Sequence, residues 1–196
     1  MAEKVESEVS TARLETLTDG IFAIAMTLLV LDLKVPHQIE NLPKLLPNLI
    51  VFLISFLVLG NYWVANHTEF RFIKRSDHGL IWLSIFFNLF ICLVPFSASL
   101  LGEHNGEKTA VFIYGINLLC VTITHYLVWM HAIKNKLVVE LDPKLVSSGN
   151  LLSYLALIPY ILAIIFGFVD TRISILIYAL TPLPYIFGIY YRLFGI

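Results

Sequence analysis

Six apolar runs, separated by short charged or turn-rich breaks, restrict the fold of this chain more than any other feature. A helix needs about 20 apolar residues to cross the roughly 30 Å hydrocarbon core of a bilayer, and these runs are close to that length. No break between them is long enough to hold a soluble domain. We therefore predict one all-α transmembrane domain over residues 1–196. Its six membrane-spanning helices are expected near residues 14–35, 48–68, 79–101, 109–132, 150–168 and 173–193.

The composition agrees with an integral membrane protein and argues against several other classes. Apolar residues make up 58% of the chain and charged residues 14%, whereas soluble domains have about 45–50% and 25%. The net charge of −1 argues against nucleic acid as a partner. Cys92 and Cys120 lie within apolar runs, so they predict small buried side chains without a disulfide or a metal site. We expect no cofactor, and the polar first 13 residues are not expected to be a cleaved signal peptide.

The distribution of Lys and Arg predicts the orientation in the membrane. If the N-terminus is inside, nine of the 13 basic residues fall on the cytoplasmic side and four on the other side. Cytoplasmic loops of membrane proteins carry an excess of Lys and Arg. Both termini are therefore predicted to be cytoplasmic.

The first span is unusually short. Its sequence, RLETLTDGIFAIAMTLLVLDLKVP, has only 12 uncharged residues between Asp19 and Asp32, which in a helix extend roughly 18 Å. Ionisable residues within spans usually face the bundle interior or water, so this helix is expected to be surrounded by protein and wet at both ends. A simpler alternative is that Asp19 caps the start of the helix, as Thr-Asp-Gly would allow.

The charged residues of this segment are expected to find partners on another helix. Arg13 and Asp19 are six positions apart, which is too far for the i,i+4 pairing of helix neighbours. The second span offers Trp63, Asn66 and His67 within one or two turns. We therefore expect His67 to have a structural role.

An apolar stripe lies on one side of the first helix. Ile24, Thr27, Leu28 and Leu31 recur at positions i, i+3, i+4 and i+7, so they share one face. Ordinary helix packing is the commoner explanation for such a stripe. In a symmetric assembly, however, the same residues would form rings, and hydrophobic rings can gate a pore.

The same segment resembles the signature helix of the transmembrane protein 175 family, which comprises endolysosomal potassium channels and their bacterial relatives. The family pattern is Arg, three residues, then Phe-Ser-Asp. Here it is matched by Arg13, Leu17, Thr18 and Asp19, with Leu for Phe and Thr for Ser. The strings YWVANH and NLFICLVPFSASLLGEH are similar to parts of the family's second and third helices. A single six-helix repeat matches the bacterial members.

The resemblance implies a homotetramer in a bacterial cell membrane, with four first helices lining a central potassium-permeable pore. Ile24 matches the apolar constriction, Thr27 a polar layer linked to selectivity, and Leu28 and Leu31 further constriction positions. Potassium ions would pass near Ile24 and Thr27, and protons are possible permeant ions as well. The structural network around the signature is matched by Arg13, Thr18, Asp19, Trp63 and His67.

The predicted function is thus passive conduction of potassium in preference to sodium through a constriction on the first helix. Asp32 and Glu40 could concentrate cations at the outer mouth, because acidic rings favour cation entry. The string TAVFIYG at 109–115 faintly resembles a potassium-channel filter, but it opens a continuous apolar run and is expected to be helical.

Two alternatives remain open at this level. A membrane haem protein would need paired axial histidines, and a secondary transporter would need helices broken at matching positions. An enzyme is not expected, because no Gly-x-Ser-x-Gly motif, His-Glu-x-x-His motif or paired intramembrane carboxylate is visible. The candidate haem ligands are His67, His104, His125 and His131, and the candidate helix breaks are Pro95, Pro159, Pro182 and Pro184.

Overall fold

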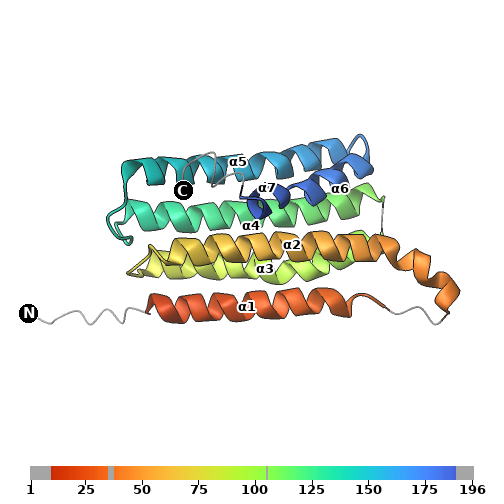
Figure 1. Cartoon of the computed structure of the whole chain (residues 1–196), viewed down its shortest axis with the longest axis horizontal. Coiled ribbons are helices and arrows are strands. Elements are labelled where there is room, and N and C mark those ends of the chain that lie inside the picture. The colour runs from red at the N-terminus through yellow and green to blue at the C-terminus, as the bar shows by residue number, and fades with distance from the viewer. Residues whose placement is uncertain (1–9, 35–37, 105, 189–196) are drawn as a thin grey trace, which may run out of the picture.

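The structure is a computed structural model of the 196-residue chain, and it describes residues 10–34, 38–104 and 106–188. Five long helices run side by side along the longest axis of the molecule (Figure 1). Shorter helices flank them, and a single β-bridge joins Ile73 to Val138 within the described residues. The helices are α1 (Thr11–Leu31), η1 (Ile39–Leu45), α2 (Leu46–Phe70), α3 (His78–Glu103), α4 (Lys108–Lys134), α5 (Pro143–Gly167), α6 (Thr171–Leu180) and α7 (Leu183–Ile186).

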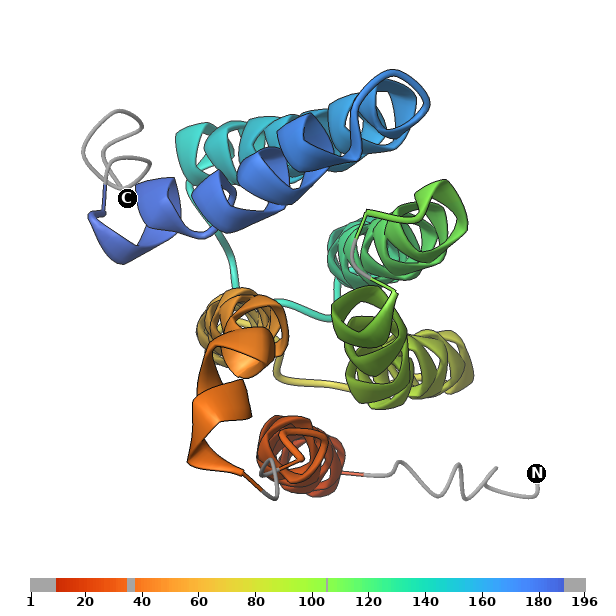
Figure 2. The ribbon, with the colours of Figure 1, turned by 90° about the vertical axis from the view of Figure 1, so that its right-hand side faces the viewer.

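The helices pack in a sequence that leaves α1 at one edge. Helix α1 packs against α2 and α3, α3 packs against α4, and α5 packs mainly against α4 and α6. Figure 2, which looks along the bundle, places α1 on the side opposite α5 and α6. Helix α1 therefore has neighbours within the chain on one face only.

The core lies where α2, α3 and α4 meet. Phe87, Ile91 and Leu118 are among its fully buried side chains. Several buried polar groups there are paired: Ser55 and Tyr114 share a hydrogen bond of 2.9 Å, and Asn117 Nδ2 donates to Ser97 Oγ at 3.1 Å. Close packing and interhelical hydrogen bonds are the forces expected to hold membrane helices together, because lipid is as apolar as the side chains.

Glycine allows one close helix approach in this core. A Cβ atom at Gly115 of α4 would collide with the Tyr178 hydroxyl of α6 and lie 2.8 Å from Ile164 Cγ1 of α5. Any larger residue at this position would push the C-terminal helices away from α4. The approach also lets Tyr178 donate to the Val111 carbonyl at 3.2 Å.

Aspartates begin three of the helices. Asp77, Asp142 and Asp170 each accept a hydrogen bond from a backbone N–H in the first turn of α3, α5 and α6, at 2.7 to 2.9 Å. Such caps satisfy N–H groups that have no partner within the helix. The capping positions fall in the charged breaks of the sequence, which explains why the helices begin there.

Five of the six predicted spans correspond closely to helices of the structure. Five helices are long and apolar enough to cross a membrane within the part of the chain that the structure describes, so the protein is an integral membrane protein. The sixth predicted span, 173–193, differs. Helix α6 ends at Leu180 after 10 residues, about 15 Å, and Pro182 and Pro184 begin the four-residue α7. Proline lacks the N–H that a helix requires, which accounts for this break, and residues 189–193 lie outside the described residues.

The other two prolines do not break their helices. Pro95 and Pro159 both lie inside continuous helices, α3 and α5 respectively. The string 109–115 is helical, as predicted, because it lies in the first two turns of α4.

Candidate pore-lining face of the first helix

Helix α1 has two faces with different surroundings. One face is buried against α2 and α3, and it consists of Leu14, Thr18, Phe22, Ala25 and Leu29. These positions follow the three- and four-residue steps of a helical stripe. The buried stripe fixes the rotation of α1 about its own axis, and thereby decides which residues point away from the bundle.

The opposite face carries the apolar stripe that the sequence singled out. Ile24 is 61% exposed, Leu28 43% and Leu31 73%, and Thr27 is also exposed. Contiguous apolar surface of this kind marks an interaction site or a lipid-facing surface. The structure therefore brings all four predicted constriction residues onto one free face of the chain.

The hydroxyl of Thr27 is oriented by its own helix. Thr27 Oγ1 donates to the Ile24 carbonyl oxygen at 2.8 Å. Since the hydroxyl has one hydrogen and two lone pairs, its hydrogen is occupied by the backbone and its lone pairs remain available. The exposed face of α1 thus offers, among apolar side chains, a hydroxyl oxygen that can accept a hydrogen bond or coordinate a cation.

The signature residue Thr18 is held from α3. It is 1% exposed, and its hydroxyl accepts a hydrogen bond from Asn88 Nδ2 at 3.0 Å. Asn88 is not among the site residues predicted from the sequence. A signal was present, because an amide in the apolar string FFNLF costs free energy unless it has a buried polar partner.

Asp19 is held from α2. Trp63 Nε1 donates to Asp19 Oδ1 at 2.9 Å, and the ring of His67 stacks on Trp63 with centroids 5.7 Å apart. His67 Nδ1 in turn lies 3.4 Å from Glu15 Oε1, one turn before Asp19. These contacts tie the first half of α1 to the last turns of α2.

The alternative that Asp19 caps the helix is wrong. Helix α1 begins at Thr11, and its N-cap is Ser10, whose hydroxyl accepts from the Arg13 N–H at 3.4 Å. Asp19 therefore lies two turns inside the helix. The propensity of Arg-Leu-Glu-Thr for helix outweighs the capping signal of Thr-Asp-Gly.

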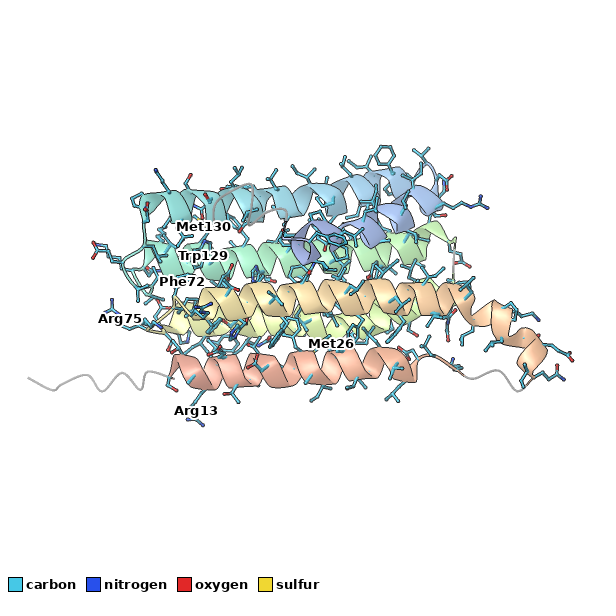
Figure 3. The ribbon with its side chains drawn as sticks, viewed as in Figure 1. Arg13, Met26, Phe72, Arg75, Trp129 and Met130 are labelled. Carbon is cyan, nitrogen blue, oxygen red and sulfur yellow. The ribbon has the colours of Figure 1, made fainter. Side chains whose placement is uncertain are left out.

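Arg13 does not join this group. Its side chain is exposed and projects from α1 away from the other helices (Figure 3). The expectation that Arg13 finds a partner on another helix is therefore not met among the described residues of this single chain. Arg13 instead lies on the same side of α1 as Ile24 and Leu31, near the other end of the helix.

Charges at the opposite end of α1 are arranged around Lys34. Lys34 Nζ forms an ion pair with Glu103 Oε1 at 2.7 Å, and this hydrogen bond, together with the Glu103 charge, raises the pKa of Lys34. Asp32 ends α1 as its C-cap, and Glu40 is exposed on η1. Asp32 is half-buried and its charge also acts on Lys34, whereas Glu40 is exposed.

The histidines are dispersed and have separate carboxylate neighbours. His67 lies near Glu15, His104 near Glu107, His125 near Glu69 and His131 near Asp77. The described residues contain no group of three or more His, Cys, Asp or Glu side chains that could hold a metal ion. The four candidate haem ligands therefore lie beside four different carboxylates in the described part of the chain.

Taken together, these features define a bundle of membrane helices whose first helix is anchored on one side and free on the other. Residues 13–95 match the family model described as the endosomal/lysosomal potassium channel TMEM175. A crystal structure of a lysosomal potassium-selective channel TMEM175 homolog from Chamaesiphon minutus superimposes with a TM-score of 0.81 and 27% identity. The superposition covers 88% of this chain and 94% of that chain.

Two relatives support the same assignment. A potassium channel of Chamaesiphon minutus is 34% identical over 133 residues, 62% of this chain and 66% of that protein. A potassium channel of Streptomyces collinus is 30% identical over 131 residues, 62% of this chain and 64% of that protein. The matches span just under two thirds of the length of these relatives. The chain is therefore similar to channels of the TMEM175 family, in sequence through residues 13–95 and in fold over most of its length.

Proposed function

We propose that the chain is a passive, potassium-permeable channel of a bacterial membrane that favours potassium over sodium. Four copies assemble around a central axis with their α1 helices inward and both termini in the cytoplasm. The observation that supports this most is the free face of α1, which carries Ile24, Thr27, Leu28 and Leu31 while the other face is packed. In a four-fold assembly each of these residues becomes a ring.

Conduction would proceed through these rings. Apolar rings at Ile24, Leu28 and Leu31 force an ion to shed part of its hydration shell, and hydrophobic constrictions can also gate by dewetting. The Thr27 hydroxyl donates its hydrogen to the Ile24 carbonyl oxygen, so the lone pairs of the hydroxyl oxygen can replace some of the lost water. Potassium is more weakly hydrated than sodium, so partial dehydration favours potassium. Protons are proposed as additional permeant ions.

The charged residues complete the proposal. Asp32 and Glu40 lie at the end of α1 where cations would enter, and acidic rings raise the local cation concentration. Thr18, Asp19, Trp63 and His67 hold α1 in its rotation and form the structural network of the signature. Arg13 belongs to this network only through contacts between subunits, because it points away from its own bundle.

The alternative functions have less support. A haem protein would need histidines at one site, whereas each of the four candidates lies beside a different carboxylate. A transporter built on broken helices would need matching breaks, whereas Pro95 and Pro159 lie in continuous helices. The similarity to TMEM175 channels favours a channel, and no catalytic role is proposed for any residue.

Cation flux into liposomes that contain the purified protein tests this function. The wild type is compared with Ile24→Asn and with a matched control, Ile161→Asn, on the exposed face of α5 at the opposite edge of the bundle. A polar ring in the constriction should lower the dehydration barrier; a decrease of about 1.4 kcal/mol would raise flux tenfold. We expect higher flux and weaker selectivity in Ile24→Asn alone. Absence of potassium flux from folded wild-type tetramers would contradict the proposal.

A further inference from the structure

A cavity of about 540 Å³ lies between α2, α4 and α5, away from the free face of α1. It exists because α5 packs mainly on α4 and α6 and leaves the side of α2 that faces it uncovered. Gly60 of α2 and Gly149 of α5 are among its lining residues, and a Cβ atom at Gly60 would meet nothing within 4 Å. The volume falls in the range of small-molecule sites, about 300–1,000 Å³.

Polar groups without hydrogen bonds line this cavity. Glu69 Oε2 and His125 Nε2 lie 3.4 Å apart, yet neither atom has a hydrogen-bond partner among the described residues. His125 is 9% exposed. Trp129 Nε1 is likewise buried without a partner. Buried polar groups usually find partners, because leaving one unpaired in an apolar environment costs about 1–3 kcal/mol, and these three atoms belong to side chains that line one cavity.

The side chains that line the cavity favour a cation over an anion. Glu69 is its only acidic lining residue, and no Lys or Arg lines it within the described part of the chain. Among the described residues, His125 lies 3.4 Å from the Glu69 carboxylate. An anionic ligand would find no Lys or Arg to pair with, whereas a cationic ligand would stabilise the ionised form of the Glu69 carboxylate.

Aromatic side chains line the same cavity as Glu69. They are Tyr62 of α2, Phe72 just after α2, Tyr126 and Trp129 of α4, and Tyr160 of α5. Figure 3 shows Phe72 and Trp129 near the same end of the bundle. Aromatic faces attract cations through the ring quadrupole, and cages of such faces recognise quaternary ammonium groups.

We propose that this cavity binds a hydrophobic organic cation, with its ammonium group beside Glu69 and its apolar body between α2 and α5. The aromatic faces and the carboxylate recognise the charge, and the apolar wall recognises the body. The site is separate from the proposed pore and does not depend on conduction.

Binding of radiolabelled phenyltrimethylammonium to the purified full-length protein, by equilibrium dialysis, tests the proposal. Its uncharged isostere, tert-butylbenzene, has the same shape without the charge and serves as the competitor control. Glu69→Gln should weaken binding by about 30-fold or more, because truncating one partner of a buried charge pair is costly. The matched control, Glu140→Gln, removes an exposed carboxylate outside the cavity and should leave binding unchanged.

A second variant keeps the test independent of charge and of the folding of Glu69→Gln. Gly60→Phe fills open space in the cavity and should also abolish binding. Unchanged binding in Gly60→Phe would overturn the proposal, and so would unchanged binding in folded Glu69→Gln. Either variant would leave binding unchanged if the ligand were bound in the pore or if a neighbouring subunit filled the cavity. Equal competition by tert-butylbenzene would overturn it too, since it would show an apolar groove that does not select charge.

Discussion

Helices α1 and α4 are both long, apolar helices with polar residues, but their polar residues have different surroundings. Helix α4 is covered by α3, α5 and α6, and its Asn117 and Thr122 bond with Ser97 and Tyr62 of other helices. On the free side of α1, Thr27 bonds only to its own backbone. Asn117 and Thr122 of α4 thus stabilise the packing of the bundle, whereas Thr27 on the free side of α1 is available to groups outside the chain.

The comparison also separates two kinds of apolar residue. Leu118 of α4 is completely buried, whereas Leu31 of α1 is 73% exposed. Both are leucines in membrane-spanning helices, so hydropathy alone does not distinguish them. Their difference comes from packing, and it predicts that substitutions in α4 affect stability while substitutions on the free face of α1 affect conduction.

The largest expected effect is on stability in α4. Leu118→Ala should lower the free energy of unfolding by about 2–5 kcal/mol, because it leaves a cavity where a buried side chain was. Leu31→Ala should change it by no more than about 0.5 kcal/mol, as is usual for an exposed position. Reversible unfolding in mixed micelles measures both. Equal losses in the two variants would break the comparison.

A smaller effect is expected where α1 is tied to α2. Trp63→Phe keeps the ring and removes the Nε1 donor to Asp19, so it should cost about 1 kcal/mol. Trp82→Phe removes an exposed bond to His78 on α3 and is the control. A double-mutant cycle with Asp19→Asn isolates the Asp19–Trp63 term in the free energy of unfolding. If the two substitutions are additive, Trp63 does not anchor α1 through this carboxylate.

The smallest effect concerns Asp77, the N-cap of α3, which lies beside His131 in the last turn of α4. Partial burial pushes the pKa of Asp77 upward, but the Leu80 N–H and His131, whose Nε2 lies 2.8 Å from Asp77 Oδ1, outweigh it and lower that pKa overall. Because the pKa is lower in the folded state, Asp77 stabilises the fold above its unfolded pKa. This contribution is lost as pH falls through the folded pKa.

Asp77→Asn tests this contribution without removing the helix cap, since Asn caps helices about as well as Asp. The variant should show a smaller loss of stability at acid pH than the wild type, when the free energy of unfolding is measured across the acid range. Glu140→Gln, in the loop after α4, is the control and should retain the wild-type profile. An unchanged acid profile in Asp77→Asn would mean that the Asp77–His131 pair does not contribute to the stability of this end of the bundle.

Much of the fold was predictable because hydropathy marks the spans directly. Four features were predicted incorrectly or not at all. The sixth run was predicted as one span from its apolar composition, although it contains Pro182 and Pro184, two of the candidate helix breaks. Asp19 carried a capping signal that the longer helical segment before it overrides. Asn88 and Glu69 depend on residues 70 and 56 positions away, Thr18 and His125, so no local pattern predicts their surroundings.

The candidate site divides in the same way. Spacing was sufficient to place Ile24, Thr27, Leu28 and Leu31 on one face. It did not predict that this face is the free one, because lipid, protein and a dewetted pore are equally compatible with apolar residues. Arg13 was expected to pair within the chain, but a residue that points outward from a single bundle has its surroundings set by what lies outside the chain, and local sequence pattern does not encode these surroundings.

Cysteine scanning along α1 tests directly whether the free face of this helix lines a pore. In a background without Cys92 and Cys120, single cysteines at positions 22 to 31 are exposed to a cationic methanethiosulfonate reagent while potassium flux is recorded in liposomes. The account predicts inhibition at Ile24→Cys, Thr27→Cys, Leu28→Cys and Leu31→Cys, and none at the packed positions Phe22, Ala25 and Leu29. Inhibition without this helical period, or at the packed positions alone, would contradict a pore lined by the free face of α1.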